Sequence, residues 1–295
     1  MPVEKRVVYS HRFLPVLLIA PQLILIGLFF YWPAVQALIQ SAYIQDPFGG
    51  SLQFVGLGNF KELFADKLYL TAFRNTAVFS ILVTVIGLSV SLVLAFFADR
   101  ALKAKLAFRT LLIWPYAVAP AVAGVLWMFL FNPTLGIATH ILKTFGYTWN
   151  HVLNGEQAMS LIVMAAVWKQ ISYNFVFFLA GLQSIPKSLI EAAALDGAGP
   201  WRTFRSIVFP LLSPTTFFLF VVNVVYAFFD TFAIVDSATQ GGPGKDTEIL
   251  VYKVYHDGVK ALDIGGSAAQ SVVLMIIVML LTFLQFRFVE KKVQY

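Results

Sequence analysis

Residues 191–210 read EAAALDGAGPWRTFRSIVFP, a polar run that contains glycine and arginine and lies between two long apolar segments. The apolar segments on either side are long enough to cross a hydrocarbon core, which takes roughly 20 residues. A polar run in this position predicts a loop on one face of a membrane. A partner on that face could use the loop to move the rest of the chain.

The composition places the chain in a lipid bilayer. Of its 295 residues, 59% are hydrophobic and only 12% are charged, which is more apolar surface than a water-soluble fold of this length buries. The net charge is +6, but the basic residues are scattered between apolar segments, so nucleic-acid binding is not predicted. The chain has no cysteine, which excludes disulfides, thiolate catalysis and cysteine-ligated metals.

Long windows with few charges predict six spanning helices. Four windows have no formal charge and two more have one each, at Lys169 and Asp230. The predicted spans are residues 13–38, 76–98, 108–131, 159–182, 207–229 and 268–286. The predicted fold class is therefore all-α, a polytopic integral membrane protein with six transmembrane helices. We expect residues 1–295 to form a single transmembrane domain.

Lysine and arginine are unevenly divided between the two sides of the predicted bundle. The termini and the second and fourth connections hold 13 of them, against 7 in the other three connections. The thirteen are Lys5, Arg6, Arg12, Arg100, Lys103, Lys105, Arg109, Lys187, Arg202, Arg205, Arg287, Lys291 and Lys292. The positive-inside rule predicts that both termini and the loop at about 187–210 lie in the cytoplasm.

Local signals predict two short helices inside the polar run. Pro186 ends the fourth span, and Ser188 with Glu191 three positions later forms a capping-box pattern, so a helix is expected over 189–196. Gly197 supplies a helix stop. A proline at position 200 suits the first turn of a second helix.

The surface of the first of these helices favours docking. Ala192, Ala193 and Ala194 leave it nearly bare, so the backbone of another protein can approach closely. Glu191 lies in the first turn, where the helix dipole favours a carboxylate that could also meet a basic residue of a partner. The alternative is an interfacial elbow that only lies on the lipid headgroups.

The spacing of this run resembles the EAA loop of the permease subunits of ABC importers. The EAA triplet is followed by Gly197 and then by Ile207, Phe209 and Pro210 at the family's intervals, with Phe209 the one departure from the usual Ile-x-Leu-Pro ending. The resemblance implies a type I importer permease fold in which this helix docks in a groove of a cytoplasmic ATPase. The coupling residues that it implies are Glu191, Ala192, Ala193, Asp196 and Gly197.

The resemblance covers nearly the whole chain. Residues 168–199 and 228–247 are similar to carbohydrate-importer permeases of the maltose type. Residues 114–133 (WPYAVAPAVAGVLWMFLFNP) and 267–275 (SAAQSVVLM) resemble, more narrowly, the permeases of sn-glycerol-3-phosphate importers. The cargo implied is sn-glycerol-3-phosphate or a glycerophosphodiester. A neutral sugar or disaccharide of the maltose type is the alternative cargo.

Polar residues within the fourth and fifth predicted spans are candidates for the substrate pathway. A charge at the centre of a membrane helix costs about 2.5–3.5 kcal/mol, so such residues are usually functional. They form a stripe on each span, at spacings that share a helix face. The candidates are Lys169, Tyr173, Asn174, Asn223, Tyr226 and Asp230. The alternative for Lys169 and Asp230 is snorkelling toward headgroups or capping of helices.

The sequence contains no nucleotide-binding motif. The glycine-rich run 241–244 before Lys245 mimics a phosphate-binding loop, but Thr239 and Asp246 stand where that motif needs Gly and Ser or Thr. No catalytic residue, metal or cofactor is predicted here. The resemblance implies that ATP and magnesium bind to a partner.

The resemblance also implies a set of partners in the cytoplasmic (inner) membrane. They are a second permease subunit, two copies of a cytoplasmic ATPase and a periplasmic substrate-binding protein, with the lipid bilayer around the permeases. Two rivals from other classes are a stand-alone secondary transporter and an enzyme that acts on lipid headgroups. Neither has a motif in its favour.

Overall fold

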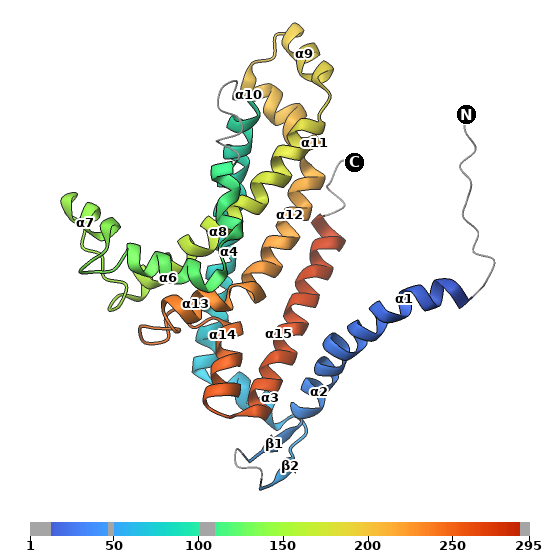
Figure 1. Ribbon diagram of the computed structural model, residues 1–295, viewed down its shortest axis with the longest axis vertical. Helices are drawn as coiled ribbons and strands as arrows, with labels where there is room; N and C mark the ends of the chain where they lie inside the picture. The colour runs from blue at the N-terminus through green and yellow to red at the C-terminus, as the bar shows by residue number, and fades with distance from the viewer. Residues whose placement is uncertain (1–12, 47–49, 101–109, 290–295) are drawn as a thin grey trace.

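The computed structural model describes residues 13–46, 50–100 and 110–289, and it is predominantly helical (Figure 1). The first elements are α1 (Phe13–Ile26), the π-helical turn η1 (Gly27–Tyr31), α2 (Trp32–Gln40), β1 (Tyr43–Gln45), β2 (Leu52–Phe54), α3 (Gly58–Ala65) and α4 (Lys67–Arg100). The middle elements are η2 (Trp114–Ala117), α6 (Pro120–Leu130), α7 (Ile137–Thr144), α8 (Gly155–Ser184), α9 (Lys187–Leu195) and α10 (Pro200–Thr203). The last are η3 (Phe204–Val208), α11 (Phe209–Leu211), α12 (Ser213–Val225), η4 (Tyr226–Asp230), α13 (Phe232–Ala238), α14 (Leu250–Tyr255), η5 (His256–Lys260), α15 (Ile264–Leu284) and η6 (Gln285–Val289).

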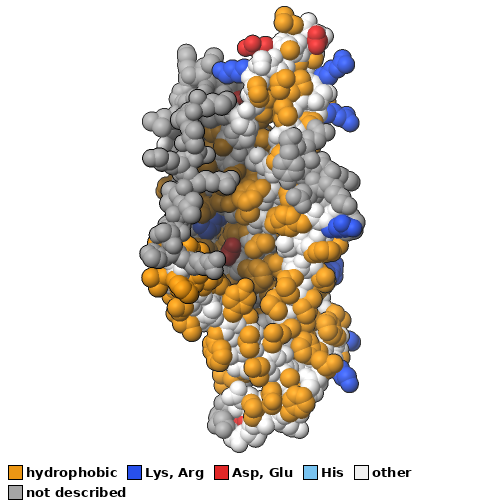
Figure 2. All heavy atoms as spheres, turned by 90° about the vertical axis from the view of Figure 1, so that its right-hand side faces the viewer, with side chains coloured by type: hydrophobic (Ala, Val, Ile, Leu, Met, Phe, Trp, Pro, Cys, Tyr) orange, Lys and Arg blue, Asp and Glu red, His pale blue; other side chains and the backbone are white. Residues whose placement is uncertain are grey.

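Within the described residues, five helical segments are long and apolar enough to cross a membrane: Phe13–Gln40, Lys67–Asp99, Gly155–Ser184, Ser213–Asp230 and Ile264–Arg287. They correspond to five of the six predicted spans. The two short strands β1 and β2 pair antiparallel outside these segments. Figure 2 shows hydrophobic side chains over most of one flank of the molecule, with acidic side chains at the end that carries α9.

The third predicted span, 108–131, is bent instead of straight. Its described part consists of Thr110–Ala117 and Pro120–Leu130, which meet at 109°. Val118 and Ala119 between them are extended (ψ 130° and 141°). Pro120 causes the break, because a proline disfavours helical backbone in the residue before it and donates no hydrogen bond.

α8 is the central helix of the bundle. It packs along α4 and also contacts α6, α12 and α13. Its buried residues lie all around its circumference, as expected of a helix enclosed by protein. Phe175 and Phe178 on α8 are fully buried with Leu212 and Leu219 from the α11–α12 region. In contrast, no residue of α1 or α2 is buried.

α6 and α13 cross at very close range through Gly124. A Cβ at this position would collide with the Ser237 hydroxyl and lie 2.8 Å from the backbone oxygen of Ile234. The backbone oxygen cannot move aside as a flexible side chain can. Only glycine therefore permits this contact, which holds the second half of the broken span against the segment that follows α12.

An ion-pair cluster closes the end of the bundle that carries β1 and β2. Lys253 lies 2.8 Å from Asp257 and 3.7 Å from Asp66. Burial by itself raises the pKa of the Asp257 carboxyl, but its bonds to Lys253, Gln270 and His256 outweigh burial and hold that pKa below its usual value. The cluster joins the start of α4 to the connection between α14 and α15.

Gly124→Ala should destabilise the protein, because the added methyl group overpacks the contact between α6 and α13. We expect the free energy of unfolding to fall by about 1–3 kcal/mol. Thermal unfolding in detergent measures the change. Gly27→Ala is the control, because a Cβ at Gly27 meets nothing within 4 Å. Equal melting temperatures for Gly124→Ala and the parent would contradict the close-packing argument.

Candidate functional site

The polar run forms two short helices at one end of the molecule, at the top of Figure 1. α9 begins directly after Pro186, and no side chain caps it. The capping box predicted from Ser188 and Glu191 is therefore wrong, because Ser188 lies inside the first turn and Pro186 occupies the capping position. α10 begins at Pro200, as predicted.

The end of α9 is a glycine-terminated cap of the Schellman type. Gly197 has a φ of +73°, in the left-handed region that favours glycine. The amide of Ala198 donates to the oxygen of Ala193 at 2.9 Å, and the amide of Gly197 donates to that of Ala194 at 3.1 Å. The predicted helix stop at Gly197 is confirmed. The cap sets the angle at which the chain returns toward α10.

The surface of α9 is open, and one of its alanines faces the protein. Ala193 is buried, whereas Glu191, Ala192 and Asp196 are exposed. A groove of about 330 Å³ separates α9 from the segment that starts at α10. Two large apolar side chains are exposed at this end of the molecule: Leu195 is 90% exposed and Trp201 is 72% exposed. Such exposed apolar groups beside charges are typical of a protein-docking surface.

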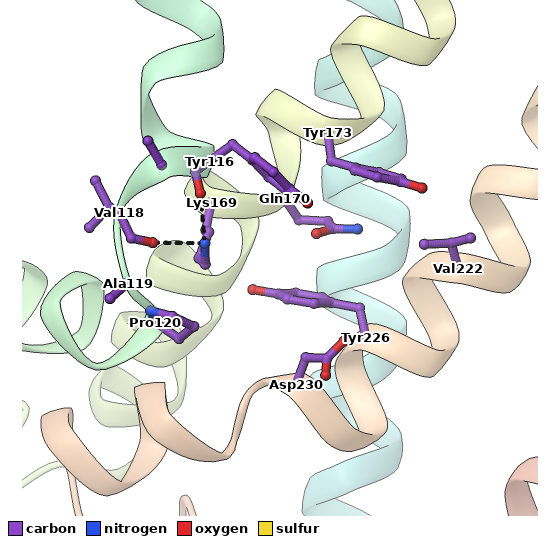
Figure 3. Close-up of a pocket in the computed structure, with 11 residues that line it drawn as sticks. Tyr116, Val118, Ala119, Pro120, Lys169, Gln170, Tyr173, Val222, Tyr226 and Asp230 are labelled. Atoms are coloured by element: carbon purple, nitrogen blue, oxygen red, sulfur yellow. Dashed lines mark hydrogen bonds between the residues drawn. The ribbon is translucent and has the colours of Figure 1, made fainter. Parts of the chain in front are cut away.

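A second site is a pocket of about 540 Å³ in the middle of the bundle (Figure 3). It lies between the break in the third span, α8 and the end of α12. Its lining residues are Tyr116, Ala117, Val118, Ala119, Pro120, Lys169, Gln170, Tyr173, Val222, Tyr226 and Asp230. Four of the six predicted pathway residues thus meet at one cavity, although they come from spans that are distant in the sequence.

Lys169 is directed at the broken span (Figure 3). Its ammonium donates to the backbone oxygen of Tyr116 at 3.1 Å and to that of Val118 at 2.8 Å. It also lies 5.3 Å from the centre of the Tyr116 ring. The side chain is buried, at 9% exposure. These bonds match the alternative of helix capping, and a pathway role for Lys169, which also lines the pocket, stays a prediction.

Tyr173, Tyr226 and Asp230 give the pocket hydroxyl and carboxylate groups. The Tyr226 hydroxyl donates to the backbone oxygen of Ala166 at 3.3 Å, which orients its ring toward α8. Asp230 is exposed at the mouth of the pocket. The sequence analysis did not single out Tyr116, whose ring lies 6.0 Å from that of Tyr173. Its place after Pro115 at a helix break is the signal that could have found it.

Asn174 and Asn223 do not line the pocket. Both are fully buried and bond to each other twice, with amide nitrogen to amide oxygen distances of 3.0 and 2.7 Å. Gly87 of α4 lies against the pair, so three spans meet there. A pathway role for these two residues stays a prediction. The geometry gives them a further task, which is to pin α8 to α12.

No metal centre accompanies these sites. Among residues 13–46, 50–100 and 110–289, no group of three or more His, Asp or Glu side chains is arranged to hold an ion. His151 is buried and accepts a hydrogen bond from the Trp149 indole at 3.2 Å. Burial lowers the pKa of His151, against an opposing effect of the Phe131 backbone oxygen. His151 is a packing residue in the connection between α7 and α8.

Comparison with known proteins gives consistent matches over the whole chain. Residues 87–295 match the family model described as binding-protein-dependent transport system inner membrane component. The sn-glycerol-3-phosphate transport system permease protein UgpA of Rhizobium meliloti (strain 1021) is 58% identical over 99% of each chain. The UgpA of Yersinia pseudotuberculosis is 59% identical over 97% of this chain and 98% of its own length.

Solved structures share the fold at much lower identity. A chain of a bacterial ABC transporter that imports the acidic polysaccharide alginate superimposes with a TM-score of 0.79 at 21% identity, over 94% of this chain and 96% of its own length. A chain of an amino acid ABC transporter gives 0.52 at 14% identity, over 79% of this chain and 97% of its own. At these identities the likeness concerns the fold, which is that of ABC importer permeases.

Replacing one asparagine of the Asn174–Asn223 pair should lower the stability of the protein by more than half of what replacing both lowers it. In Asn174→Leu the Asn223 amide loses its partner in a buried site, so the free energy of unfolding should fall by about 1–3 kcal/mol. The double variant Asn174→Leu with Asn223→Leu should cost less than the sum of the single variants, by up to about 1.7 kcal/mol.

A denaturation series in detergent on both single variants and the double variant measures this coupling. Gln22→Leu, on the exposed face of α1, is the control and should change stability by less than about 0.5 kcal/mol. Strict additivity of the two substitutions would show that the amides do not stabilise each other.

Proposed function

Because this chain belongs to the family of binding-protein-dependent transport system inner membrane components, we propose that it is a permease subunit of an ATP-driven importer for sn-glycerol-3-phosphate or a related glycerophosphodiester. It forms part of the translocation path across the inner membrane. One observation carries the choice of cargo: the relatives that match nearly its full length are named as sn-glycerol-3-phosphate transport permeases.

The coupling segment is the proposed point of attachment to the motor. Glu191, Ala192 and Asp196 are exposed at one tip of the molecule, and Leu195 and Trp201 lie uncovered beside them. A partner ATPase that binds ATP and magnesium would seat α9 in a groove and pair a basic residue with Glu191. The Gly197 cap holds the α9–α10 turn in shape, so that a pull on α9 reaches α8 and α12.

The proposed assembly contains several chains. It has a second, UgpE-like permease, two copies of a UgpC-like ATPase and a UgpB-like periplasmic binding protein. The end of the bundle with α9 faces the cytoplasm, as do both termini, and the end with β1 and β2 receives the binding protein. This chain acts as a single transmembrane domain over residues 1–295, with the coupling loop at about 187–210, and ATP hydrolysis occurs on its partner.

The central pocket is the proposed part of the substrate path. The hydroxyls of Tyr116, Tyr173 and Tyr226, with the amide of Gln170, suit a cargo rich in oxygen. Alternating exposure of the pocket to the two sides follows when two permeases rock against each other on ATP binding. The exposed Asp230 marks the side of the pocket from which a second subunit would complete it.

Glu191→Lys should abolish uptake, because it reverses the charge that would meet a basic residue of the ATPase. The variant should still insert in the membrane, since Glu191 is exposed and carries no fold contact that the structure records. Uptake of radiolabelled cargo into cells, with the amount of the chain in the membrane measured alongside, tests this. Glu156→Lys, an exposed residue at the opposite end of α8, is the matched control. Normal transport by Glu191→Lys would remove the coupling role.

The cargo assignment predicts a selective response at the soluble receptor. The cognate binding protein should bind radiolabelled sn-glycerol-3-phosphate, and an excess of unlabelled sn-glycerol-3-phosphate, but not of maltose, should displace it. The same selectivity should appear in uptake by proteoliposomes that contain the assembled transporter. Displacement by maltose alone would favour the neutral-disaccharide alternative, and uptake by this chain without any ATPase would favour a secondary transporter.

A further inference from the structure

We infer that Lys169 is a positioning residue that passes the movement of the coupling segment to the wall of the central pocket. The inference rests on the proposed function and adds a physical connection between its two sites. These sites lie apart along the bundle, since α9 is at its tip (Figure 1) and Lys169 of the pocket lies halfway along α8.

The first step of the connection is α8 itself. It runs unbroken from Gly155 to Ser184 and contains no proline. Only Ile185 and Pro186 separate the end of α8 from α9. Because this connection is short and not helical, α9 can move little without moving α8. Lys169 lies 15 residues from Ser184, which is about 22 Å along a helix. A displacement of α9 therefore moves α8, and the Lys169 ammonium moves with this helix.

The second step is the attachment of Lys169 to the broken span. The Tyr116 oxygen comes from the last turn before the break and the Val118 oxygen from the break itself, where no continuing helix can pair them. The Lys169 ammonium supplies donors to both. Inside a bilayer an unpaired carbonyl has no water to bond with, so the fold strongly favours keeping this pairing.

The third step is that the attached segment is the pocket wall. Residues 116–120 form one side of the cavity, and the Tyr116 ring faces Tyr173. The bend of 109° contains two extended residues and can change its angle more readily than a continuous helix can. A movement of α8 would thus be transferred to the broken span through the Lys169 ammonium, together with the ring contacts of Trp168 with Trp114 and Trp127.

The rival role for Lys169 is direct binding of an anionic cargo. The geometry disfavours it in this conformation, because the Lys169 side chain is buried and its ammonium already donates to two backbone oxygens. The two roles differ in a measurable way. A cargo ligand matters only when cargo is bound, whereas a positioning residue alters the pocket wall in the absence of cargo.

The test uses site-specific labelling in the assembled transporter. The chain contains no cysteine, so Ala119→Cys provides a unique thiol on the exposed wall of the pocket. Its rate of modification by a water-soluble thiol reagent is followed by the mass of this chain, without cargo, in the nucleotide-free transporter and after trapping with ATP and vanadate. The variants compared in this background are Lys169→Met, Lys169→Gln and Lys169→Arg. Lys143→Met, an exposed lysine of α7, is the charge-matched control.

With Lys169 present, trapping should change the labelling rate by at least about fivefold, the lower range for coupled sites. In Lys169→Met the change should fall below about twofold, and uptake should be lost while the binding protein still stimulates ATP hydrolysis. Lys169→Arg should preserve most of the response, because a guanidinium also presents several donors, and Lys169→Gln, with fewer, should give an intermediate response. Should Lys169→Met fail to assemble, the ranking of Gln and Arg tests the same inference.

Two results would overturn the inference. One is an unchanged response to trapping in Lys169→Met. The other is a raised KM for sn-glycerol-3-phosphate in that variant with labelling like the parent, which would make Lys169 a cargo ligand. If the parent itself shows no response to trapping, and α9 is not shielded by the ATPase, the importer proposal itself fails.

Discussion

Backbone groups inside a bilayer must find partners within the protein, and this requirement governs the architecture. The five unbroken spans among the described residues meet it with helical backbone, and the first of them packs against α15 through α2. The third span does not, because Pro120 ends its first helical part and leaves the oxygens of Tyr116 and Val118 without helical partners. Lys169 supplies those partners from α8. The break, the buried charge and the pocket are thus three aspects of a single arrangement.

Buried polar groups in this bundle join helices instead of standing alone. The Asn174–Asn223 amide pair and the bond from Ser91 to the Ile171 oxygen connect α4, α8 and α12 at neighbouring levels. Since lipid offers no hydrogen bonds, such contacts specify which helices pack together and in what register. They make the core around α8 a rigid frame. The bent third span is attached to α8 through Lys169 and through the ring contacts of Trp168 with Trp114 and Trp127, and to α13 at Gly124.

The division between a rigid frame and a bent wall suits the family's task. Its members are inner membrane components of binding-protein-dependent transport systems, and a subunit of the proposed kind would change the exposure of a cavity. The exposed faces of α1 and α9, and the open side of the pocket at Asp230, fit a subunit completed by neighbours. Protein and lipid contacts would cover them.

The amino-acid sequence determined the features that depend on local chemistry. Apolar windows located the spans, Gly197 marked the end of α9 and Pro200 the start of α10, and the EAA spacing identified the family, because each signal lies within a few consecutive residues. The tertiary structure alone decided what depends on contacts between distant residues. It separated Asn174 and Asn223, which bond to each other, from Lys169, Tyr173, Tyr226 and Asp230, which line a pocket. It also brought Lys169 to the broken span 51 residues away, a pairing that helix periodicity cannot predict because it depends on how two helices cross.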